Sequence, residues 1–309
     1  MPLEQDRPLG YDRPLYILAC DHRGSFQKKM FGISGTPTPK EAARISDAKK
    51  VVFEGLWRAL EDGTSKESAG ILIDEEFGAE IARKARAEGL NLAMPVEKSG
   101  QDEFDFDYGE EFGPHITDFD PAFTKVLVRY NPVGDPKMNE RQAKRLQLLS
   151  GWLRDQGRRF LFELLVPAEP SQLEKLGNDT DRYDTELRPK LMVEAIAALQ
   201  GAGVEPDIWK IEGLDRREDC ESISAQVRSG GRDGVGCVVL GRGADDAKVH
   251  HWLRQGAGVA GYLGFAIGRT IWWDAVKGYL DGSLHRETAA EQVARRYRES
   301  IAVYEAAAS

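Results

Sequence analysis

The feature that most constrains the fold is a recurrence: short apolar runs of strand-forming residues alternate along the chain with longer amphipathic stretches. Most runs are followed by a segment with helical periodicity, and the first such segment opens with a capping box at Thr38 and Glu41. Strands that alternate with helices are typical of a parallel α/β sheet. The runs span residues 15–23, 69–75, 90–98, 123–132, 159–167, 206–213, 236–243 and 261–272.

The number of runs favours a closed sheet. Eight runs predict one (β/α)₈ TIM barrel over residues 1–309, with an extra C-terminal helix near 287–306. A doubly wound open sheet is the alternative, but its Gly-rich fingerprint is missing after the first run. Two connections depart from the pattern. Residues 101–121 are acidic and aromatic and predict a poor helix near one barrel mouth, and the polar residues 168–185 predict a lid.

Composition and charge exclude several classes of partner. The net charge of −9 argues against nucleic acid as the main partner. No apolar run reaches the length of a membrane span, and the first residues lack the apolar core of a signal peptide, so we expect a cytoplasmic protein. The three cysteines lack zinc or redox spacing. We expect no cofactor and no metal, because His250 and His251 point to different faces of a helix without metal-spaced carboxylates around them.

Lys210 is the residue around which we organise the functional prediction. Side chains alternate along a strand, so Ile208, Lys210 and Glu212 share one face. A charged lysine on the inward face of a barrel is costly. It is retained either because a carboxylate pairs with it or because its amine serves as a nucleophile. A purely structural lysine, paired with Glu163 or Glu212, is the alternative.

Four other charged side chains lie near the C-terminal ends of runs: Asp21, Lys125, Glu163 and Arg269. Active sites of barrels form at this end, and buried charges are penalised unless they are paired, so we predict a mutually paired catalytic cluster around Lys210. Glu163 is the predicted acid/base, with Asp21 and Lys125 positioning it. The alternatives stay open: Glu163 only neutralises the lysine, Asp21 only caps a turn, and Lys125 only lies at the rim with a solvated head.

Two glycine–arginine loops predict a phosphate site. Gly241, Arg242 and Gly243 follow the seventh run, and Gly268 and Arg269 follow the eighth. Barrels often bind phosphate with the loops after these two strands. Glycine lets the backbone approach an anion, and arginine can bind it through two parallel hydrogen bonds. Tight packing at barrel corners, with arginines on the surface, is the alternative.

Two further arginines, Arg23 and Arg129, follow the first and fourth runs. We treat both as candidate substrate-binding residues, with structural ion pairs as the alternative. Trp272 and Trp273 could serve the interface of a homo-oligomer, although tryptophans after a barrel strand more often belong to the core.

The motifs at the ends of the runs resemble those of the class I, Schiff-base-forming barrel aldolases. Among these, the motifs are similar to those of the aldolase-like domain that is often fused behind the sugar kinase of bacterial myo-inositol catabolism. A more distant similarity links the chain to the tagatose-1,6-bisphosphate aldolases. The residues that carry the resemblance are Leu18–Ser25, Lys125–Pro132, Phe162–Leu164, Trp209–Glu212 and Gly264–Trp272.

The resemblance implies roles for individual residues. It implies that Lys210 forms the Schiff base, Glu163 is the acid/base, Lys125 assists, and Arg269 with the glycine before it holds phosphate. The implied substrate is a phosphorylated keto sugar. For the inositol relatives the implied reaction is cleavage of 2-deoxy-5-keto-gluconate 6-phosphate to dihydroxyacetone phosphate and malonate semialdehyde.

Two departures from the relatives bear on the substrate. The fused kinase has no counterpart in these residues, so the pathway is not given by the sequence. The seventh run ends in Gly241–Gly243, where we expect a hydroxyl-bearing loop in the tagatose enzymes. This departure argues against a tagatose substrate more than against aldol chemistry. Two other functions remain as hypotheses: a barrel that binds a sugar phosphate without turnover, and a metal-dependent aldolase.

Overall fold

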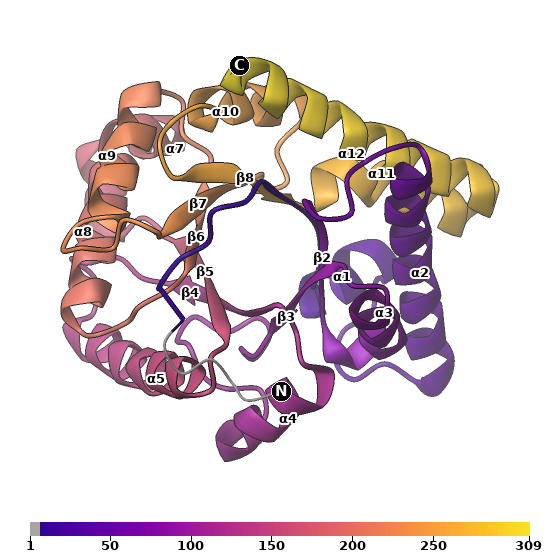
Figure 1. Cartoon of the computed structure of the whole chain (residues 1–309), viewed down its shortest axis with the longest axis horizontal. Helices are drawn as coiled ribbons and strands as arrows, with labels where there is room; N and C mark the ends of the chain where they lie inside the picture. Colours follow the sequence, from indigo (N-terminus) through magenta and orange to yellow (C-terminus); the bar gives the residue numbers. More distant parts are fainter. Residues whose placement is uncertain (1–6) are drawn as a thin grey trace.

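The strands form a closed parallel barrel in this computed structural model, which describes residues 7–309. Each strand pairs with the next one along the chain, and the last pairs with the first (Figure 1). The predicted (β/α)₈ barrel is therefore confirmed. The strands are β1 (Leu15–Cys20), β2 (Ala69–Ile73), β3 (Asn91–Pro95), β4 (Phe123–Arg129), β5 (Arg159–Leu165), β6 (Ile208–Glu212), β7 (Gly236–Leu240) and β8 (Tyr262–Ile267).

Helices surround this barrel (Figure 1). The longer ones are α2 (Pro39–Glu61), α3 (Glu75–Ala87), α4 (Phe112–Phe119), α5 (Pro136–Asp155), α8 (Arg188–Gly201), α9 (Arg217–Val227), α10 (Asp246–Gly256), α11 (Arg269–Asp281) and α12 (Arg286–Ala308). Shorter helical segments are α1 (Gly24–Phe26), α6 (Pro170–Lys175), α7 (Thr180–Arg182), the π-helices η1 (Gln27–Phe31) and η3 (Tyr183–Leu187), and the 3₁₀ turn η2 (Gly109–Glu111). The predicted capping box is present at the start of α2, where Glu41 accepts a 2.8 Å hydrogen bond from the backbone N–H of Thr38.

The predicted extra helix at the C-terminus is α12. It lies along the outside of the barrel and packs against α2 and α11 (Figure 1). The two helices α2 and α12 approach closely at Gly55, where a Cβ would lie 2.5 Å from the side chain of Val293. Tyr297 ties α12 to the barrel, because its buried hydroxyl donates to the backbone oxygen of Tyr16 at 2.5 Å. Helix α12 is therefore part of the barrel's outer layer.

The two irregular connections contain more helix than the sequence predicts. Residues 101–121 include α4, so the prediction of a poor helix was wrong there. Three residues of α4, Phe112, Ile116 and Phe119, are buried at helical spacing, and the ring of Phe112 stacks on Phe106 with centroids 4.4 Å apart. This apolar face outweighs the acidic composition around it. Residues 168–185 form α6, α7 and the start of η3.

The interior of the barrel has an apolar half and a charged half. The apolar half lies toward the N-terminal ends of the strands and is closed by Tyr11, whose ring meets Phe123 edge-on at 5.2 Å. The segment before β1 is held there by an ion pair between Arg7 and Asp207, at 2.6 Å. The buried residues of this half are Tyr11, Leu15, Ile17, Ala19, Leu72, Ala93, Phe123, Leu161, Ile208, Val238 and Ala266.

Two predictions about surfaces can be compared with the structure. Trp272 is fully buried, and its indole N–H donates to the backbone oxygen of Ala19 at 2.9 Å, so this tryptophan belongs to the core. None of the helices in the described part of the chain combines the length and the apolar character that a membrane span requires.

Candidate active site

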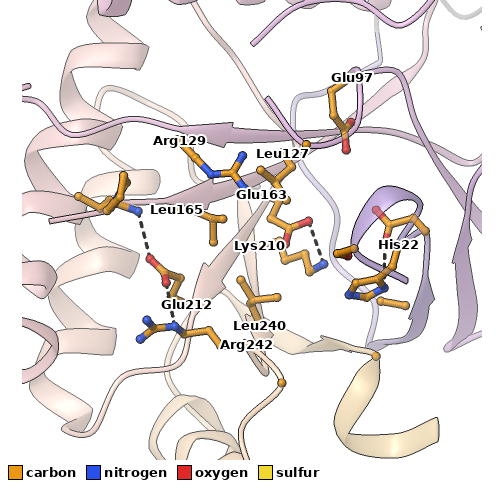
Figure 2. A pocket seen from close by; sticks show the side chains of 18 of the residues that line it. His22, Glu97, Leu127, Arg129, Glu163, Leu165, Lys210, Glu212, Leu240 and Arg242 are labelled. Atoms are coloured by element: carbon orange, nitrogen blue, oxygen red, sulfur yellow. Dashed lines mark hydrogen bonds and ion pairs between the residues drawn. The ribbon is translucent and has the colours of Figure 1, made fainter. Parts of the chain in front are cut away.

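The register of the barrel strands places Lys210 beside Glu163. The two residues are direct neighbours across β5 and β6, and both point inward. Lys210 Nζ donates to Glu163 Oε2 at 3.0 Å (Figure 2). The same oxygen lies 3.0 Å from Lys125 Nζ, which comes from β4 on the other side of β5. One carboxylate oxygen therefore lies between two lysine nitrogens.

The two lysines differ in how many carboxylates surround them. Lys125 Nζ lies 2.7 Å from Asp21, 2.7 Å from Glu97 and 3.0 Å from Glu163. Burial alone would lower the pKa of Lys125, but the three carboxylates outweigh it and raise that pKa well above its ordinary value. Lys125 is therefore a fixed cation, whereas Lys210 has Glu163 as its single carboxylate partner among the described residues.

The carboxylates of the cluster respond to the lysines in different ways. Burial would raise the pKa of Asp21 and of Glu163, but the charges of Lys125 and Lys210 outweigh it and lower both pKa values. For Glu97 burial prevails, and its pKa is raised despite the neighbouring Lys125. Two carboxylates of the cluster therefore stay ionised, while Glu97 holds a proton more readily.

Glu97 is a member of the cluster that our sequence reasoning missed. It follows β3 with the same inward parity as Ala93 and Pro95. Its Oε1 accepts from Lys125, and its buried Oε2 has no hydrogen-bond partner within residues 7–309. The signal was present in the sequence, because Glu97 lies near the end of the third apolar run, as Asp21 and Glu163 do in the first and fifth.

A cavity of about 790 Å³ opens above the cluster at the C-terminal ends of the strands. Lys210, Glu163 and Asp21 lie in its wall, together with Arg129 and Arg269. This volume is ordinary for a site that binds a small metabolite. The predicted catalytic residues are therefore brought together around one cavity.

The loop after β8 has the geometry of an anion site. A Cβ at Gly268 would lie 2.3 Å from the backbone oxygen of Ala19, so only glycine fits there. Helix α11 begins directly afterwards at Arg269, without a side-chain cap from Gly268. The N-terminus of a helix attracts anions through its free N–H groups and its dipole. The Arg269 guanidinium donates to the backbone oxygen of Arg242 at 2.9 Å and has no carboxylate within 4.0 Å in the described chain. Burial lowers the pKa of Arg269, and the charge of Glu163 only partly opposes this.

The loop after β7 has a different character. Arg242 has a positive φ of 52° and forms ion pairs with Glu212 at 3.1 Å and with Asp184 at 2.6 Å (Figure 2 shows the first). A Cβ at Gly241 would lie 3.2 Å from the side chain of Ile267, as expected for tight corner packing. A Cβ at Gly243 would lie 2.7 Å from the Arg269 guanidinium, so Gly243 gives that arginine room. This loop supports Arg269 and has no uncompensated arginine of its own.

Arg23 and Arg129 also occupy different environments. Arg23 is buried, pairs with Asp107 at 2.6 Å and donates to the backbone oxygen of Glu97, which fits the structural alternative. Arg129 lines the cavity, and its Nη1 donates to the backbone oxygen of Gln101 at 2.8 Å. No carboxylate of the described residues lies within 4.0 Å of the Arg129 guanidinium.

His22 is a second cavity residue that sequence reasoning did not select. Its Nδ1 lies 4.0 Å from Asp21 Oδ1, and its ring packs edge-on against Trp272. Burial lowers the pKa of His22 to about 4, against the opposing charge of Asp21. His22 is therefore a neutral imidazole at neutral pH. Within residues 7–309, no group of three or more His, Cys, Asp or Glu side chains is arranged to hold a metal ion.

The fold and the site together define a class: a closed α/β barrel with a lysine–carboxylate cluster at the carboxyl ends of its strands. The model of the family described as "Uncharacterized protein conserved in bacteria (DUF2090)" matches residues 10–308, and the chain belongs to this family. No curated protein matches the sequence.

Several solved structures share the barrel. A fructose-bisphosphate aldolase from Slackia heliotrinireducens is 15% identical with a TM-score of 0.54, and the alignment covers 91% of this chain and 85% of that one. A protein from Corynebacterium glutamicum is 16% identical with a TM-score of 0.57, covering 95% and 88%. A Schiff-base-forming fructose-1,6-bisphosphate aldolase is 13% identical with a TM-score of 0.55, covering 94% of each chain. At such identities the shared feature is the fold alone.

Proposed function

We propose that this protein is a class I aldolase that cleaves a phosphorylated keto sugar or keto-sugar acid through a Schiff base on Lys210. The observation that carries the proposal is the position of the Lys210 amine. It lies in a cavity wall, 3.0 Å from one carboxylate, while the neighbouring Lys125 is held among three. Nucleophilic lysines need such access to a carbonyl group and such a proton acceptor.

Each group of the cluster has a place in the proposed chemistry. The Lys210 amine attacks the keto carbon, and loss of water gives an iminium ion. The bond between the α and β carbons of the iminium ion then breaks, and its electron pair flows into the iminium to give an enamine. The hydroxyl on the β carbon loses its proton at the same time, and this carbon leaves as the carbonyl carbon of an aldehyde. Protonation of the resulting enamine and hydrolysis release the second product. Glu163 accepts and returns the protons, and the Lys125 cation keeps Glu163 ionised at the start of the cycle.

The phosphate group of the substrate is assigned to the β8 side of the mouth. Gly268 and the start of α11 offer backbone donors there, and the Arg269 guanidinium has no carboxylate within 4.0 Å among the described residues. Gly243 makes room for that guanidinium. We do not assign phosphate to Arg242, whose charge is already matched by Glu212 and Asp184.

Our finer proposal for the substrate is 2-deoxy-5-keto-gluconate 6-phosphate, cleaved to dihydroxyacetone phosphate and malonate semialdehyde in myo-inositol catabolism. It is supported by the resemblance of the strand-end motifs, and by the presence of Arg269 and Lys210 in the wall of the same cavity. A tagatose bisphosphate is the second choice, because the loop at Gly241–Gly243 offers no hydroxyl side chain.

Trapping the Schiff base tests the proposal. The protein is incubated with dihydroxyacetone phosphate, reduced with borohydride and digested, and the modified peptide is identified by mass spectrometry. We expect one adduct, on Lys210, and none in Lys210→Met. The matched control is Lys125→Met, which keeps Lys210 and should still give an adduct there, in lower yield.

Two other results would point elsewhere. Stabilisation by dihydroxyacetone phosphate without any adduct would favour a barrel that binds sugar phosphates without turnover. Turnover that EDTA abolishes, again without an adduct, would favour a metal-dependent aldolase. An adduct confined to another lysine would refute the assignment of Lys210.

A further inference from the structure

Two arginines in the cavity wall have no carboxylate partner within the described residues, and they lie on opposite sides of the mouth. Arg129 ends β4 and Arg269 follows β8. In a closed barrel of eight strands, β4 and β8 are four strands apart in either direction. Lys210, on β6, lies halfway between them along one arc. A substrate whose keto carbon reaches Lys210 can therefore direct one end to each arginine.

The two ends of this path offer different numbers of donors. The β8 side combines Arg269 with the uncapped start of α11, and the exposed Lys29 also borders the cavity there. This supply of charge suits a phosphate dianion. On the β4 side, Arg129 already uses Nη1 for the backbone oxygen of Gln101. The remaining N–H groups of its planar guanidinium suit a single carboxylate, whose two oxygens can accept two parallel hydrogen bonds.

The wall between Lys210 and Arg129 contains two leucines, and the carboxylate beside them, Glu212, is already paired with Arg242 at 3.1 Å. Leu127 and Leu165 line it, and Figure 2 shows both beside Arg129 and next to the Lys210–Glu163 pair. The residue after Gln101, Asp102, is exposed at the rim, where water screens its charge. Leucine side chains offer no partner to a hydroxyl group, so a hydroxyl-bearing carbon beside them would lose its hydrogen bonds with water. A methylene group forms no hydrogen bonds with water, so it can lie beside these leucines without such a loss.

The geometry points to Arg129, with Leu127 and Leu165, as the subsite that selects the departing aldehyde: a short aldehyde whose carboxylate is separated from the carbonyl by a methylene group. This inference rests on the proposed Schiff-base function and adds its specificity determinant. Arg129 binds the carboxylate, the two leucines cover the methylene, and the phosphate stays on the opposite side with Arg269. The subsite contributes to the choice of aldehyde and takes no part in forming the Schiff base.

The test uses the condensation direction, with dihydroxyacetone phosphate and two aldehydes of equal carbon number. Malonate semialdehyde carries the carboxylate, and propanal replaces it with a methyl group. In the unmodified protein, kcat/KM for malonate semialdehyde should exceed that for propanal by about 10- to 100-fold, the usual effect of a charge-assisted hydrogen-bonded pair. Arg129→Met should lower kcat/KM for malonate semialdehyde toward the value for propanal, so that the ratio of the two falls close to one.

Controls separate the subsite from the rest of the site. Arg129→Lys keeps the charge without the planar fork and should retain part of the preference. Arg254→Met, an exposed arginine on α10, should retain all of it. Borohydride trapping with dihydroxyacetone phosphate involves no aldehyde, so it measures Schiff-base formation by the unmodified protein separately from the choice of aldehyde.

The outcomes distinguish a failure of the Schiff-base function from a failure of the Arg129 subsite. Failure to trap the unmodified protein would overturn the Schiff-base function itself. Normal trapping with equal use of both aldehydes by the unmodified protein would overturn the Arg129 subsite alone, whether or not the variants fold. A preference that survives in folded Arg129→Met would do the same.

Discussion

The two halves of the barrel interior are built from the same strands, yet one is apolar and closed whereas the other is charged and open to a cavity. Along β4, β5 and β6 the apolar residues Phe123, Leu161 and Ile208 are each followed, two positions later, by a charged one. The first set packs with Tyr11 and closes the N-terminal end of the barrel. The second set, among them Lys210, surrounds the open cavity at the other end.

The difference shows how one strand can serve stability and chemistry separately. The apolar half gains free energy by removing hydrocarbon from water. The charged half gains little net free energy, because desolvation offsets most of the attraction within a buried ion pair. Under the proposed function the charges are retained because the reaction needs them, so substitutions in the two halves should have separable effects on turnover and on stability.

The largest expected effect is on turnover, in the charged half. Lys210→Met removes the nucleophile, and kcat for cleavage should fall by at least about 10⁴-fold. The melting temperature should stay close to that of the unmodified protein, because Lys125 still neutralises Glu163 at 3.0 Å. Coupled detection of dihydroxyacetone phosphate and a thermal melt measure the two quantities. Residual turnover near the unmodified rate would remove the proposed distinction between the halves.

The next effect is on stability, in the apolar half. Leu161→Ala leaves a cavity two residues before Glu163 and should lower the free energy of unfolding by about 2–5 kcal/mol. The kcat of the folded fraction should be little changed. The matched control is Leu148→Ala on α5, where the side chain is 61% exposed and the change should stay within about 0.5 kcal/mol. Urea unfolding measures both changes. Equal losses of unfolding free energy in the two variants would contradict the assignment of stability to the apolar half.

A third comparison, within the charged half, is between two arginines of the cavity wall. Arg269→Met removes the arginine without a carboxylate partner and should raise KM for the phosphorylated substrate about 10- to 100-fold, with kcat nearly constant. Arg242→Met removes an arginine already matched by Glu212 and Asp184, so its effect on KM should be clearly smaller. Steady-state kinetics of both variants decide the order. A larger effect at Arg242 would move the phosphate to the loop after β7.

The smallest effect concerns pH and His22. Burial lowers the pKa of His22 to about 4, whereas an unfolded histidine titrates near about 6.5. Between these values the unfolded state binds a proton that the native state does not, so stability falls as pH falls from 6.5 toward 4. Because the ring is 25% exposed, we expect a loss of about 1–2 kcal/mol.

Comparison with a variant isolates this contribution. Asp21 and Glu163, whose pKa values are lowered in the folded state, also lose stability in acid, as their folded forms become protonated. Urea unfolding of His22→Gln between pH 7 and pH 4.5 should therefore show a shallower decline than the unmodified protein. Substitution of the exposed His285 should leave the slope unchanged. Equal slopes for His22→Gln and the unmodified protein would show that His22 is not the group responsible.

Much of the barrel could be predicted from the chain, because alternation of apolar runs with amphipathic segments is a local property. Helix α4 was missed because acidic residues surround it in the sequence. Its apolar face, formed by Phe112, Ile116 and Phe119, is recognised only from its burial in the folded structure. Glu97 was missed although it lies near the end of the third apolar run, because the sequence does not show which of the charges near strand ends contact one another. Its role depends on the 2.7 Å contact with Lys125.

The sequence by itself determined which charged residues lie at inward positions in or just after the strands, and hence that Asp21, Lys125, Glu163 and Lys210 would share one end of the barrel. Strand parity and parallel order require this, because both are properties of the local chain. Only the tertiary structure decided how the charges are matched: within residues 7–309, Lys125 meets three carboxylates and Lys210 meets one. The physical reason is that a buried charge is governed by what lies within a few ångströms of it, and those neighbours come from strands far apart in the chain.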